Sequence, residues 1–448
     1  MTTVIAALTA GLGAIPVATP LCVGLSGGLD SMVLLHALVH LTPPRPVRAL
    51  HVNHHLSQSA DQWQQRCQDY CASLKVGFTA KSVDVNSALT AAGSGIEAAA
   101  RSLRYKAFEE NLKQHETLLL AHHLDDQLET LLLRLMRGAS VQGLSAIPVS
   151  RALGSEQLLR PLLPLTRSEL VDYAQANELA WVEDDSNLDI SFDRNYCRHS
   201  VLPVLAKRWP NYRESWSKSL QLISEAADIV DSVATQDIDQ AISGHPGILN
   251  IRVLTALPEP RQRSALRHWL ARIAAPELGW KPLNDLIQKL KTHQGSAQTL
   301  SQSGNFQLMA YQDELHGLRR LENPQWPQRS WSMARESTFV LPANGELILH
   351  PDSDLNEWLA NLGEVSIRYR QGGEHFKPRG RPTKSLKQVF QETAVPPWLR
   401  DRLPLIYSGE SLVFIPTVGA SEAFDWSGLG QPASVNIVWR QPSFNWFE

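Results

Sequence analysis

The sequence predicts an α/β protein. It should begin with a parallel β-sheet covered by helices on both faces and continue into a helical connector domain and a small C-terminal α/β or mainly β domain. From Leu21 to about residue 186, short apolar runs alternate with amphipathic segments of helical length, which is typical of a buried parallel sheet with crossover helices. Residues 214–292 then show mostly helical spacing of apolar residues. From about residue 298 the pattern changes to short strand-like runs.

Strands and helices follow one another in a regular order in the N-terminal half. The first 20 residues contain no Lys or Arg and are interrupted by Gly11, Gly13, Pro16 and Pro20, so we expect a helix and a turn instead of a signal peptide. The expected sheet segments are 21–25, 47–52, 78–85, 117–122, 158–163 and 180–184. The expected helices are 31–41, 61–74, 96–112, 125–138 and 166–178. Such sheets bind ligands at the carboxyl ends of their strands.

Length and composition predict a folded protein of several domains. For 448 residues, at roughly 150 residues per domain, we expect a catalytic domain over 1–213, a mostly helical connector over 214–325 and a C-terminal domain over 326–448. The contents of 43% apolar and 19% charged residues are typical of globular proteins, and no uninterrupted apolar run predicts a membrane span. Cys22, Cys67, Cys71 and Cys197 follow neither zinc-site nor disulfide spacing, which favours the reducing cytoplasm.

The net charge of −3 conceals a basic segment near the C-terminus. Residues 366–402 hold nine Lys or Arg residues against three acidic residues, so this segment carries +6 and the rest of the chain −9. A concentrated basic surface is the usual footprint of nucleic-acid binding. The candidate contacts in it are Arg370, Lys377, Arg379, Arg381, Lys384 and Lys387.

A glycine-containing loop, Ser26-Gly27-Gly28-Leu29-Asp30-Ser31, joins the first strand to a helix. Its backbone N–H groups and the positive end of the helix dipole suit the phosphates of ATP. Asp30 is the candidate Mg²⁺ ligand, because this cation prefers carboxylate and phosphate oxygens. The loop has no lysine, which argues against the G-x-x-x-x-G-K-[ST] class. The simpler alternative is a Ser-Gly turn in which Asp30 caps the helix.

The second strand ends in polar residues at the same edge of the expected sheet. His51, Asn53, His54 and His55 lie within five residues, which raises the alternative of a metal site. The strand alternates its faces and no Asp, Glu or Cys is adjacent. We therefore expect contact with adenine or ribose, with His51 and Asn53 as the candidates.

The helix expected over 96–112 presents two arginines on one stripe. Glu97, Arg101 and Arg104 are spaced by four and three residues, so they share a helix face. Arg101 and Arg104 can neutralise phosphates or the charge that develops on a transferring phosphoryl group. The alternative is a solvated Glu97–Arg101 pair.

The fourth strand leads into an acidic helix. Asp126 and Glu129 lie opposite an expected buried stripe formed by Leu128, Leu131, Leu132 and Leu135. Carboxylates three residues apart repel one another, so a cation is expected near them, either Mg²⁺ or a substrate amine. The favourable helix dipole explains an acid in the first turn but not Glu129.

A dense run of charge follows the last expected strand, in residues 183–187 and 194–198. Arg194 and Arg198 are one helical turn apart and can contact phosphate or a nucleic-acid backbone. The alternative is an exposed charged loop.

Taken in order, SGGLDS, HVNHHL, IEAAARSLRY, HHLDDQLET, RPLL, EDDSN and RNYCRH resemble the tRNA(Ile)-lysidine synthase family of the PP-loop ATP-pyrophosphatase superfamily. Residues 368–406 are similar to that family's tRNA-binding domain. The resemblance implies an ATP-dependent ligase that adenylates the oxygen at carbon 2 of the wobble cytidine in the isoleucine tRNA with a CAU anticodon. The side-chain amine of free L-lysine then displaces AMP, which changes decoding from AUG to AUA and amino-acid identity from methionine to isoleucine.

The resemblance also implies roles for individual residues. ATP would contact residues 26–31 with His51, Asn53 and Arg101, and Asp30 would hold Mg²⁺. Asp30, Arg104, Asp126 and Glu129 would act in catalysis, the last two by binding lysine. Arg194, Arg198 and the basic C-terminal residues would bind tRNA, with Phe376 and Trp398 available for stacking. The sequence leaves a homodimer open.

The sequence argues against three other functions. A PP-loop tRNA thiolase would need cysteines for sulfur delivery, but Cys67 and Cys71 lie one turn apart in an ordinary amphipathic helix and fit buried small residues better. The basic C-terminal segment and the lack of a glutaminase-like segment count against a PP-loop synthetase that makes a small-molecule amide. A non-enzymatic RNA-binding module would leave SGGLDS and HHLDDQLET unexplained.

Overall fold

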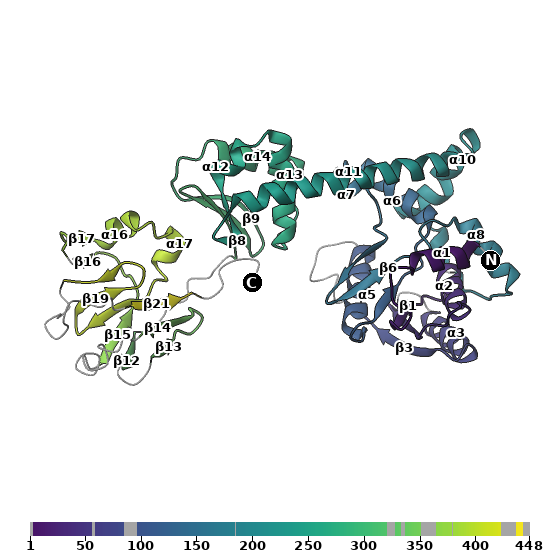
Figure 1. Ribbon diagram of the computed structural model, residues 1–448, viewed down its shortest axis with the longest axis horizontal. Helices are drawn as coiled ribbons and strands as arrows, with labels where there is room; N and C mark the ends of the chain where they lie inside the picture. Colours follow the sequence, from purple (N-terminus) through teal and green to yellow (C-terminus); the bar gives the residue numbers. More distant parts are fainter. Residues whose placement is uncertain are drawn as a thin grey trace. The chain divides into compact units, whose positions relative to one another are not determined.

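The computed structural model describes residues 3–55, 59–84, 96–183, 185–319, 328–332, 337–350, 364–378, 380–422 and 436–441. The chain divides into two compact units, residues 1–229 and 230–448, and Figure 1 shows their elements. Within the described ranges, no helix is long and apolar enough to span a membrane.

The first unit is built around a six-stranded sheet in the order β3-β2-β1-β4-β6-β5. Its strands are β1 (Leu21–Gly24), β2 (Val47–Asn53), β3 (Gly77–Ser82), β4 (Thr117–Leu119), β5 (Ser150–Leu153) and β6 (Glu156–Leu159). Neighbouring strands pair in parallel except β5 and β6, which form an antiparallel hairpin at one edge. The predicted α/β class is therefore confirmed, with an antiparallel edge strand that the sequence did not predict.

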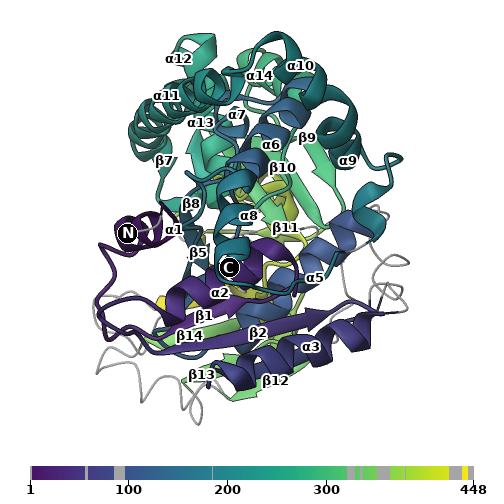
Figure 2. The ribbon, with the colours of Figure 1, turned by 90° about the vertical axis from the view of Figure 1, so that its right-hand side faces the viewer.

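Helices cover both faces of this sheet, as Figure 2 shows from a second direction. The helices that pack on it are α1 (Thr3–Gly11), α2 (Leu29–Val39), α3 (Ala60–Ser73), α5 (Ile96–Asn111) and α8 (Arg167–Ala176), whereas α6 (Leu124–Met136) and α7 (Val141–Leu144) belong to a separate apolar cluster. Alternate strand residues face opposite sides. Leu21 and Val23 pack in the core formed with α1, α2, α3 and α8, whereas Cys22 and Leu118 pack in the core formed with α5.

The strand expected over 180–184 is not formed in the described residues 180–183, so this expectation was wrong. The backbone N–H of Val182 instead donates one hydrogen bond to the carbonyl of Gly27 at 3.0 Å. Trp181 packs against the core beneath α2 and α8. This segment therefore holds the loop after β1 through a backbone hydrogen bond instead of adding a strand to the sheet.

A helical segment completes the first unit. It consists of η1 (Asp185–Leu188), α9 (Asp193–Tyr196), the π-helical turn η2 (Cys197–Val201), α10 (Leu202–Arg208) and α11 (Tyr212–Ala241), which continues beyond residue 229 into the second unit. Leu202 and Tyr212 pack with Leu128 and Leu131 of α6. This packing brings the segment onto the helix that carries Asp126 and Glu129. The expected buried stripe of α6 extends less far than predicted, because Leu135 is 48% exposed.

The second unit begins with a small α/β layer around the sheet β7-β8-β11-β10-β9. Its elements are β7 (Ile242–Ser243), β8 (His245–Asn250), α12 (Ile251–Ala256), α13 (Glu259–Arg272), α14 (Trp280–Lys291), β9 (Gln298–Ser303), β10 (Phe306–Tyr311) and β11 (Glu314–Arg319). Trp269 of α13 and Leu286 of α14 pack on Leu308 of β10.

The C-terminal part consists mainly of antiparallel strands, as the sequence predicted. Strands β12 (Arg329–Ser332), β15 (Glu364–Arg368), β18 (Leu405–Ser408), β19 (Ser411–Ile415) and β20 (Gly419–Ala420) form one sheet. A second sheet contains β13 (Thr338–Val340), β14 (Glu346–His350) and β21 (Asn436–Arg440), and a third pairs β16 (His375–Phe376) with β17 (Lys384–Ser385). Helices α16 (Leu386–Glu392) and α17 (Pro397–Arg400) complete this part.

Candidate active site

The loop between β1 and α2 has a conformation that requires glycine. Gly27 has φ +87°, and a Cβ atom there would lie 2.9 Å from the sulfur of Cys67. The N–H groups of Ser26 and Gly27 both donate to the hydroxyl oxygen of Ser31 at 3.2 Å, and this hydroxyl donates to the carbonyl of Gly28 at 3.0 Å. Ser31 therefore fixes the loop at the N-terminus of α2, where the positive end of the helix dipole is suited to an anion.

A cavity of about 510 Å³ opens beside this loop, a volume within the usual range for small-molecule sites. It brings together seven of the predicted residues, which come from the loop after β1 and from α2, β2, α5 and α6. They are Ser26, Asp30, Ser31, His51, Asn53, Arg104 and Asp126. Gly27, Gly28, Leu29, Arg101 and Glu129 do not line it.

Burial disfavours the charged form of two histidines at the end of β2, His51 and His54. Burial lowers the pKa of His51, although its ring Nδ1–H donates to the carbonyl of Leu25 at 2.8 Å. Burial and the nearby Arg104 lower the pKa of His54 to about 4. Among the described residues, no group of three or more His, Cys, Asp or Glu side chains is arranged to hold a metal ion.

Asn53 stabilises the wall of the cavity through its side-chain hydrogen bonds. Its amide donates to the carboxylate of Asp61 at 3.0 Å and to the side-chain Oε1 of Gln64 at 3.3 Å, and its oxygen accepts from the backbone N–H of His55 at 2.9 Å. These bonds fix the end of β2 against α3, so the side chain supports the cavity wall as well as lining it.

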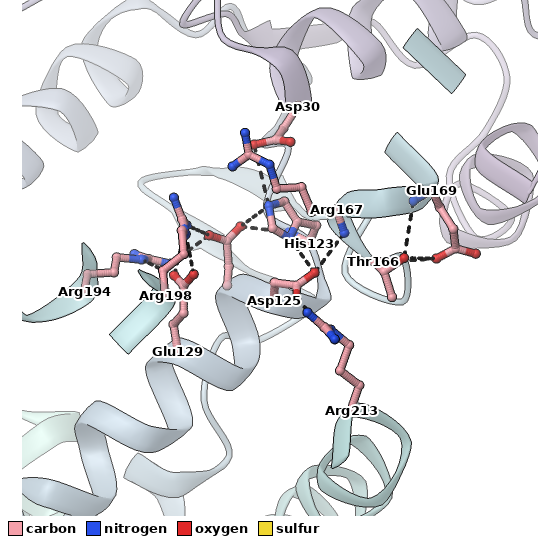
Figure 3. A network of polar contacts seen from close by, with 11 residues as sticks. Asp30, His123, Asp125, Glu129, Thr166, Arg167, Glu169, Arg194, Arg198 and Arg213 are labelled. Carbon is pink, nitrogen blue, oxygen red and sulfur yellow. Dashed lines mark hydrogen bonds and ion pairs between the residues drawn. The ribbon is translucent and has the colours of Figure 1, made fainter. Parts of the chain in front are cut away.

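His123 stands at the centre of a carboxylate cluster at the start of α6 (Figure 3). Its ring Nε2 lies 3.6 Å from both Asp30 and Asp126, and its Nδ1 lies 3.9 Å from Asp125. Burial by itself lowers the pKa of this histidine, but the carboxylates raise it above its usual value. Burial raises the pKa of Asp126, yet His123 and Arg194 bring it below its usual value.

Asp30 offers the feature expected of a cation ligand. Its Oδ1 is buried and has no hydrogen-bond partner among the described residues, while its Oδ2 faces His123. A buried carboxylate oxygen without a donor is costly. A hard cation in the cavity would satisfy it.

Glu129 is fully buried and is held by two arginines, which Figure 3 shows converging on it. Arg194 Nε donates to Oε2 at 2.7 Å, and Arg198 Nε donates to Oε1 at 2.7 Å. Arg194 Nη2 also donates to Asp126 at 2.8 Å. The cation expected beside Asp126 and Glu129 is therefore supplied by the protein itself. Arg194 and Arg198, which supply this positive charge, were also predicted to contact tRNA. That contact remains a prediction.

A second cavity of about 450 Å³ lies beside the same network. Asp125 and Glu129 line it together with Arg167, Arg213 and Tyr212. Asp125 accepts from Arg213 Nε and from the backbone N–H of Arg167, each at 2.8 Å. The hydroxyl of Tyr212 is buried and has no hydrogen-bond partner among the described residues. This cavity offers both charges and an unsatisfied hydroxyl to a polar ligand.

Sequence reasoning missed several members of this network. His123 precedes α6 and was named only as part of a motif, although its position as N-cap, with Asp126 accepting from its N–H at 3.0 Å, is a recognisable local signal. Arg213 has no such signal, because it lies 88 residues from its partner Asp125. Only the packing of α11 on α6 brings them together.

The basic C-terminal segment is more neutral than its sequence suggests. Arg370 pairs with Asp401 at 3.2 Å, Lys377 with Glu422 at 2.9 Å and Lys384 with Glu392 at 2.6 Å. Arg381 and Lys387 are exposed. Arg379 lies outside the described residues.

The expectation that Phe376 could stack on a base was wrong. Phe376 is only 2% exposed, because the β16–β17 hairpin turns it into the C-terminal core. Trp398 is partly buried against the same core, and its ring meets His316 edge-on at 5.0 Å.

All four cysteines are buried and free. Burial raises the pKa of Cys67 to about 12 and that of Cys71 to about 11. Both belong to the core between α3 and the sheet. They are therefore protonated small core residues at neutral pH.

The sheet, the loop after β1 and the adjoining cavity define the first unit as an ATP-binding domain of the PP-loop class, and a family model described as a PP-loop domain matches residues 5–205. Models described as the TilS substrate binding domain and the TilS substrate C-terminal domain match residues 249–316 and 365–439. The chain belongs to the tRNA(Ile)-lysidine synthase family, whose members are ATP-dependent ligases.

Three relatives illustrate this membership. The chain is 38% identical over 413 residues to the tRNA(Ile)-lysidine synthase of Coxiella burnetii, covering 91% of this chain and 90% of that protein. It is 36% identical over 424 residues to that of Serratia proteamaculans, covering 94% of each. It is 38% identical over 412 residues to that of Pseudomonas syringae pv. tomato, covering 88% of this chain and 87% of that protein.

Proposed function

We propose that this protein ligates free L-lysine to carbon 2 of the wobble cytidine in the isoleucine tRNA with a CAU anticodon. ATP adenylates the oxygen at carbon 2, and pyrophosphate leaves. The side-chain amine of lysine then forms a bond to carbon 2, while the C–O bond breaks and AMP departs with its electrons. The observation that supports this proposal most strongly is that one cavity is lined by both the Ser26–Ser31 loop and Asp126.

ATP would place its phosphates at the loop and the start of α2. The positive end of the α2 dipole favours phosphate oxygens there. His51 and Asn53, at the end of β2, would face the nucleoside. Leu29 begins the helix and belongs to the core, so its backbone contributes and its side chain does not.

Mg²⁺ would be held by Asp30, whose buried Oδ1 is without a donor. The cation would neutralise charge on the phosphate oxygens. Arg104 lines the same cavity and would stabilise the charge that develops as pyrophosphate leaves.

Lysine would approach through the second cavity, which adjoins Asp125 and Glu129. We assign the direct contact with the amine to Asp126, because this carboxylate faces the ATP cavity and its lowered pKa keeps it anionic. Glu129 is enclosed, and both of its oxygens already accept from guanidinium groups. Its role is to position Arg194 and Arg198 around Asp126.

The amine must lose a proton before or during its attack on carbon 2, because an ammonium ion has no free electron pair. Asp126 and the adjacent His123 provide a short path for this proton. The neighbouring carboxylates raise the pKa of His123, which favours a proton on its ring.

The tRNA would be bound in part by the C-terminal domain. Arg381 and Lys387 are the exposed candidates, with Arg370, Lys377, Lys384 and Arg379 as further phosphate contacts. We further propose that the domains end near residues 213 and 325, and that the enzyme acts in the cytoplasm. A homodimer remains a prediction.

The buried cysteines argue against the thiolase alternative. Buried thiols with strongly raised pKa values cannot act as sulfur carriers, because the thiolate is the reactive form. The small-molecule synthetase alternative does not account for the matches to the two TilS substrate domains.

The direct test is incorporation of labelled lysine into an unmodified transcript of the isoleucine tRNA with a CAU anticodon. Incorporation should require ATP and Mg²⁺ and should be absent with methionine tRNA. Transfer of sulfur from a sulfide donor, without lysine incorporation, would contradict the proposal.

A further inference from the structure

Four arginine side chains surround the ring of Tyr105 in the first unit. The guanidinium carbon of Arg151 lies 4.4 Å from the ring centre, that of Arg101 5.3 Å and that of Arg104 6.0 Å. Arg160 Nη2 donates to the Tyr105 hydroxyl at 3.3 Å. We call these five residues the arginine cluster.

The arginine cluster is assembled from three parts of the chain. Helix α5 supplies Arg101, Arg104 and Tyr105, the edge strand β5 supplies Arg151, and the segment after β6 supplies Arg160. Arg160 is buried and is fixed by a 2.7 Å hydrogen bond to the carbonyl of Pro148. Arg101 and Arg151 are exposed. The buried Arg160 and the half-buried Tyr105 therefore hold the two exposed guanidinium groups of Arg101 and Arg151 in place.

The two exposed arginines of the arginine cluster, Arg101 and Arg151, are not paired with acids in the part of the chain that the structure describes. Among side chains that the structure describes, neither Arg101 nor Arg151 forms an ion pair with a carboxylate, and their contacts are with the Tyr105 ring. The side chain of Glu97, one turn before Arg101, lies outside that description. Burial raises the pKa of Tyr105, but Arg101, Arg160 and Arg104 bring it below its usual value. Such a concentration of positive charge attracts anions.

The position of the arginine cluster indicates which anion it meets. Arg104 lines the ATP cavity, whereas Arg101 and Arg151 do not. A polynucleotide that inserts one base into the cavity must lay its flanking phosphates on the surrounding rim. Guanidinium groups held against an aromatic ring are suited to contact such phosphates.

We propose that Arg101 and Arg151 bind backbone phosphates of the tRNA next to the cytidine that is modified. This inference rests on the proposed function, and it assigns Arg101 to RNA instead of ATP. These contacts would position the nucleotide without reading its base. Arg151 would thereby give the antiparallel edge strand β5 a part in substrate binding.

The test compares Arg101→Ala and Arg151→Ala with Lys113→Ala. Lys113 is exposed and lies before β4, at the end of the strands opposite the cavity, so its loss changes the charge equally. Each arginine variant should weaken tRNA binding about tenfold. It should also reduce the slope of log Kd against log salt concentration by about 0.7. The KM for ATP should not change, and Lys113→Ala should bind like the wild type.

A second measurement identifies the ligand atoms. A tRNA joined from synthetic halves carries neutral methylphosphonates in place of the phosphates that flank the wobble cytidine. This change should weaken tRNA binding by the wild type, but it should not further weaken tRNA binding by the double variant Arg101→Ala with Arg151→Ala. Equal additional losses in both proteins would contradict the inference, as would a raised KM for ATP with normal tRNA binding. Inactive wild-type protein would overturn the proposed function and this inference together, whereas active wild type with normal binding by both variants would overturn the inference alone.

Discussion

Replacing Glu129 by glutamine tests the buried network that supports Asp126. Glu129 is fully enclosed and accepts from Arg194 at 2.7 Å and from Arg198 at 2.7 and 3.1 Å, and these arginine side chains are 27% and 24% exposed. Breaking a buried ion pair by removing one charge costs about 3–5 kcal/mol. Because the glutamine amide keeps the shape of the side chain and one acceptor oxygen, we expect the free energy of unfolding to fall by about 3 kcal/mol, the lower end of this range. This corresponds to a fall in Tm of about 6–12 °C for a unit of this size.

The same variant should lose activity beyond its loss of stability. Without Glu129, Arg194 is no longer fixed beside Asp126, and misplacement of a catalytic group by about 1 Å can cost about 100-fold in rate. We therefore expect kcat for lysine incorporation to fall about 100-fold at a temperature where the variant is folded. Circular dichroism and the labelled-lysine assay measure the two effects.

Glu116→Gln is the matched control. Glu116 is also buried and accepts from a single arginine, Arg48, at 2.6 and 2.5 Å, but it lies before β4 at the end of the sheet away from the cavity. This variant should lose comparable stability and keep its kcat. The reasoning fails if Glu129→Gln retains normal kcat when folded, or if both variants lose activity in proportion to stability.

Three further predictions follow from the geometry. Gly27→Ala should cost about 1–3 kcal/mol, because φ is +87° and Cβ meets a neighbouring sulfur; unchanged ATP binding and stability in calorimetry would contradict the loop assignment. The raised pKa of His123 adds stability that is complete below its unfolded pKa of about 6.5 and is lost as pH rises through the folded pKa. Urea unfolding across this range should therefore show a loss in the wild type that His123→Asn lacks. The double change Arg381→Ala with Lys387→Ala should lower the salt dependence of tRNA binding by up to about 1.4. Arg370→Ala, which breaks an ion pair with Asp401, should lower it less, and equal slopes for all proteins would refute this ranking.

The parts of the fold that the sequence predicted are those determined by local pattern. The loop after β1 could be predicted because a buried strand, two glycines and a helix follow one another within about twenty residues. The α5 and α6 helices were likewise visible from their apolar spacing. The prediction of a strand at residues 180–183 was wrong, because an apolar run of strand length also fits an irregular segment that packs on a core.

The parts of the site that the sequence did not predict depend on distant partners. Glu129 and Asp126 were singled out correctly as a pair that needs a cation, but Arg194 and Arg198 meet them across 65 to 69 positions of the chain. Arg213 reaches Asp125 across 88 positions. The spacing of residues within one helix does not show which distant side chains will meet it. An external amine or metal was therefore expected beside the two carboxylates.

The basic C-terminal segment shows the same difference between sequence and structure. Its charge was evident, but the acids that neutralise part of it, such as Asp401 and Glu422, are brought to it by turns and strand pairing. Phe376 was expected to be available for stacking, yet strand alternation places it in the core. Charge density alone therefore overestimates the number of free cations.

The measurement that tests the central claim most directly follows one oxygen atom. A tRNA substrate carries ¹⁸O at carbon 2 of its wobble cytidine, and the AMP released during lysine incorporation is analysed by mass spectrometry. If ATP activates this oxygen by adenylation, the AMP should contain the ¹⁸O. Unlabelled AMP, formed while lysine is incorporated, would contradict an adenylated cytidine as the intermediate.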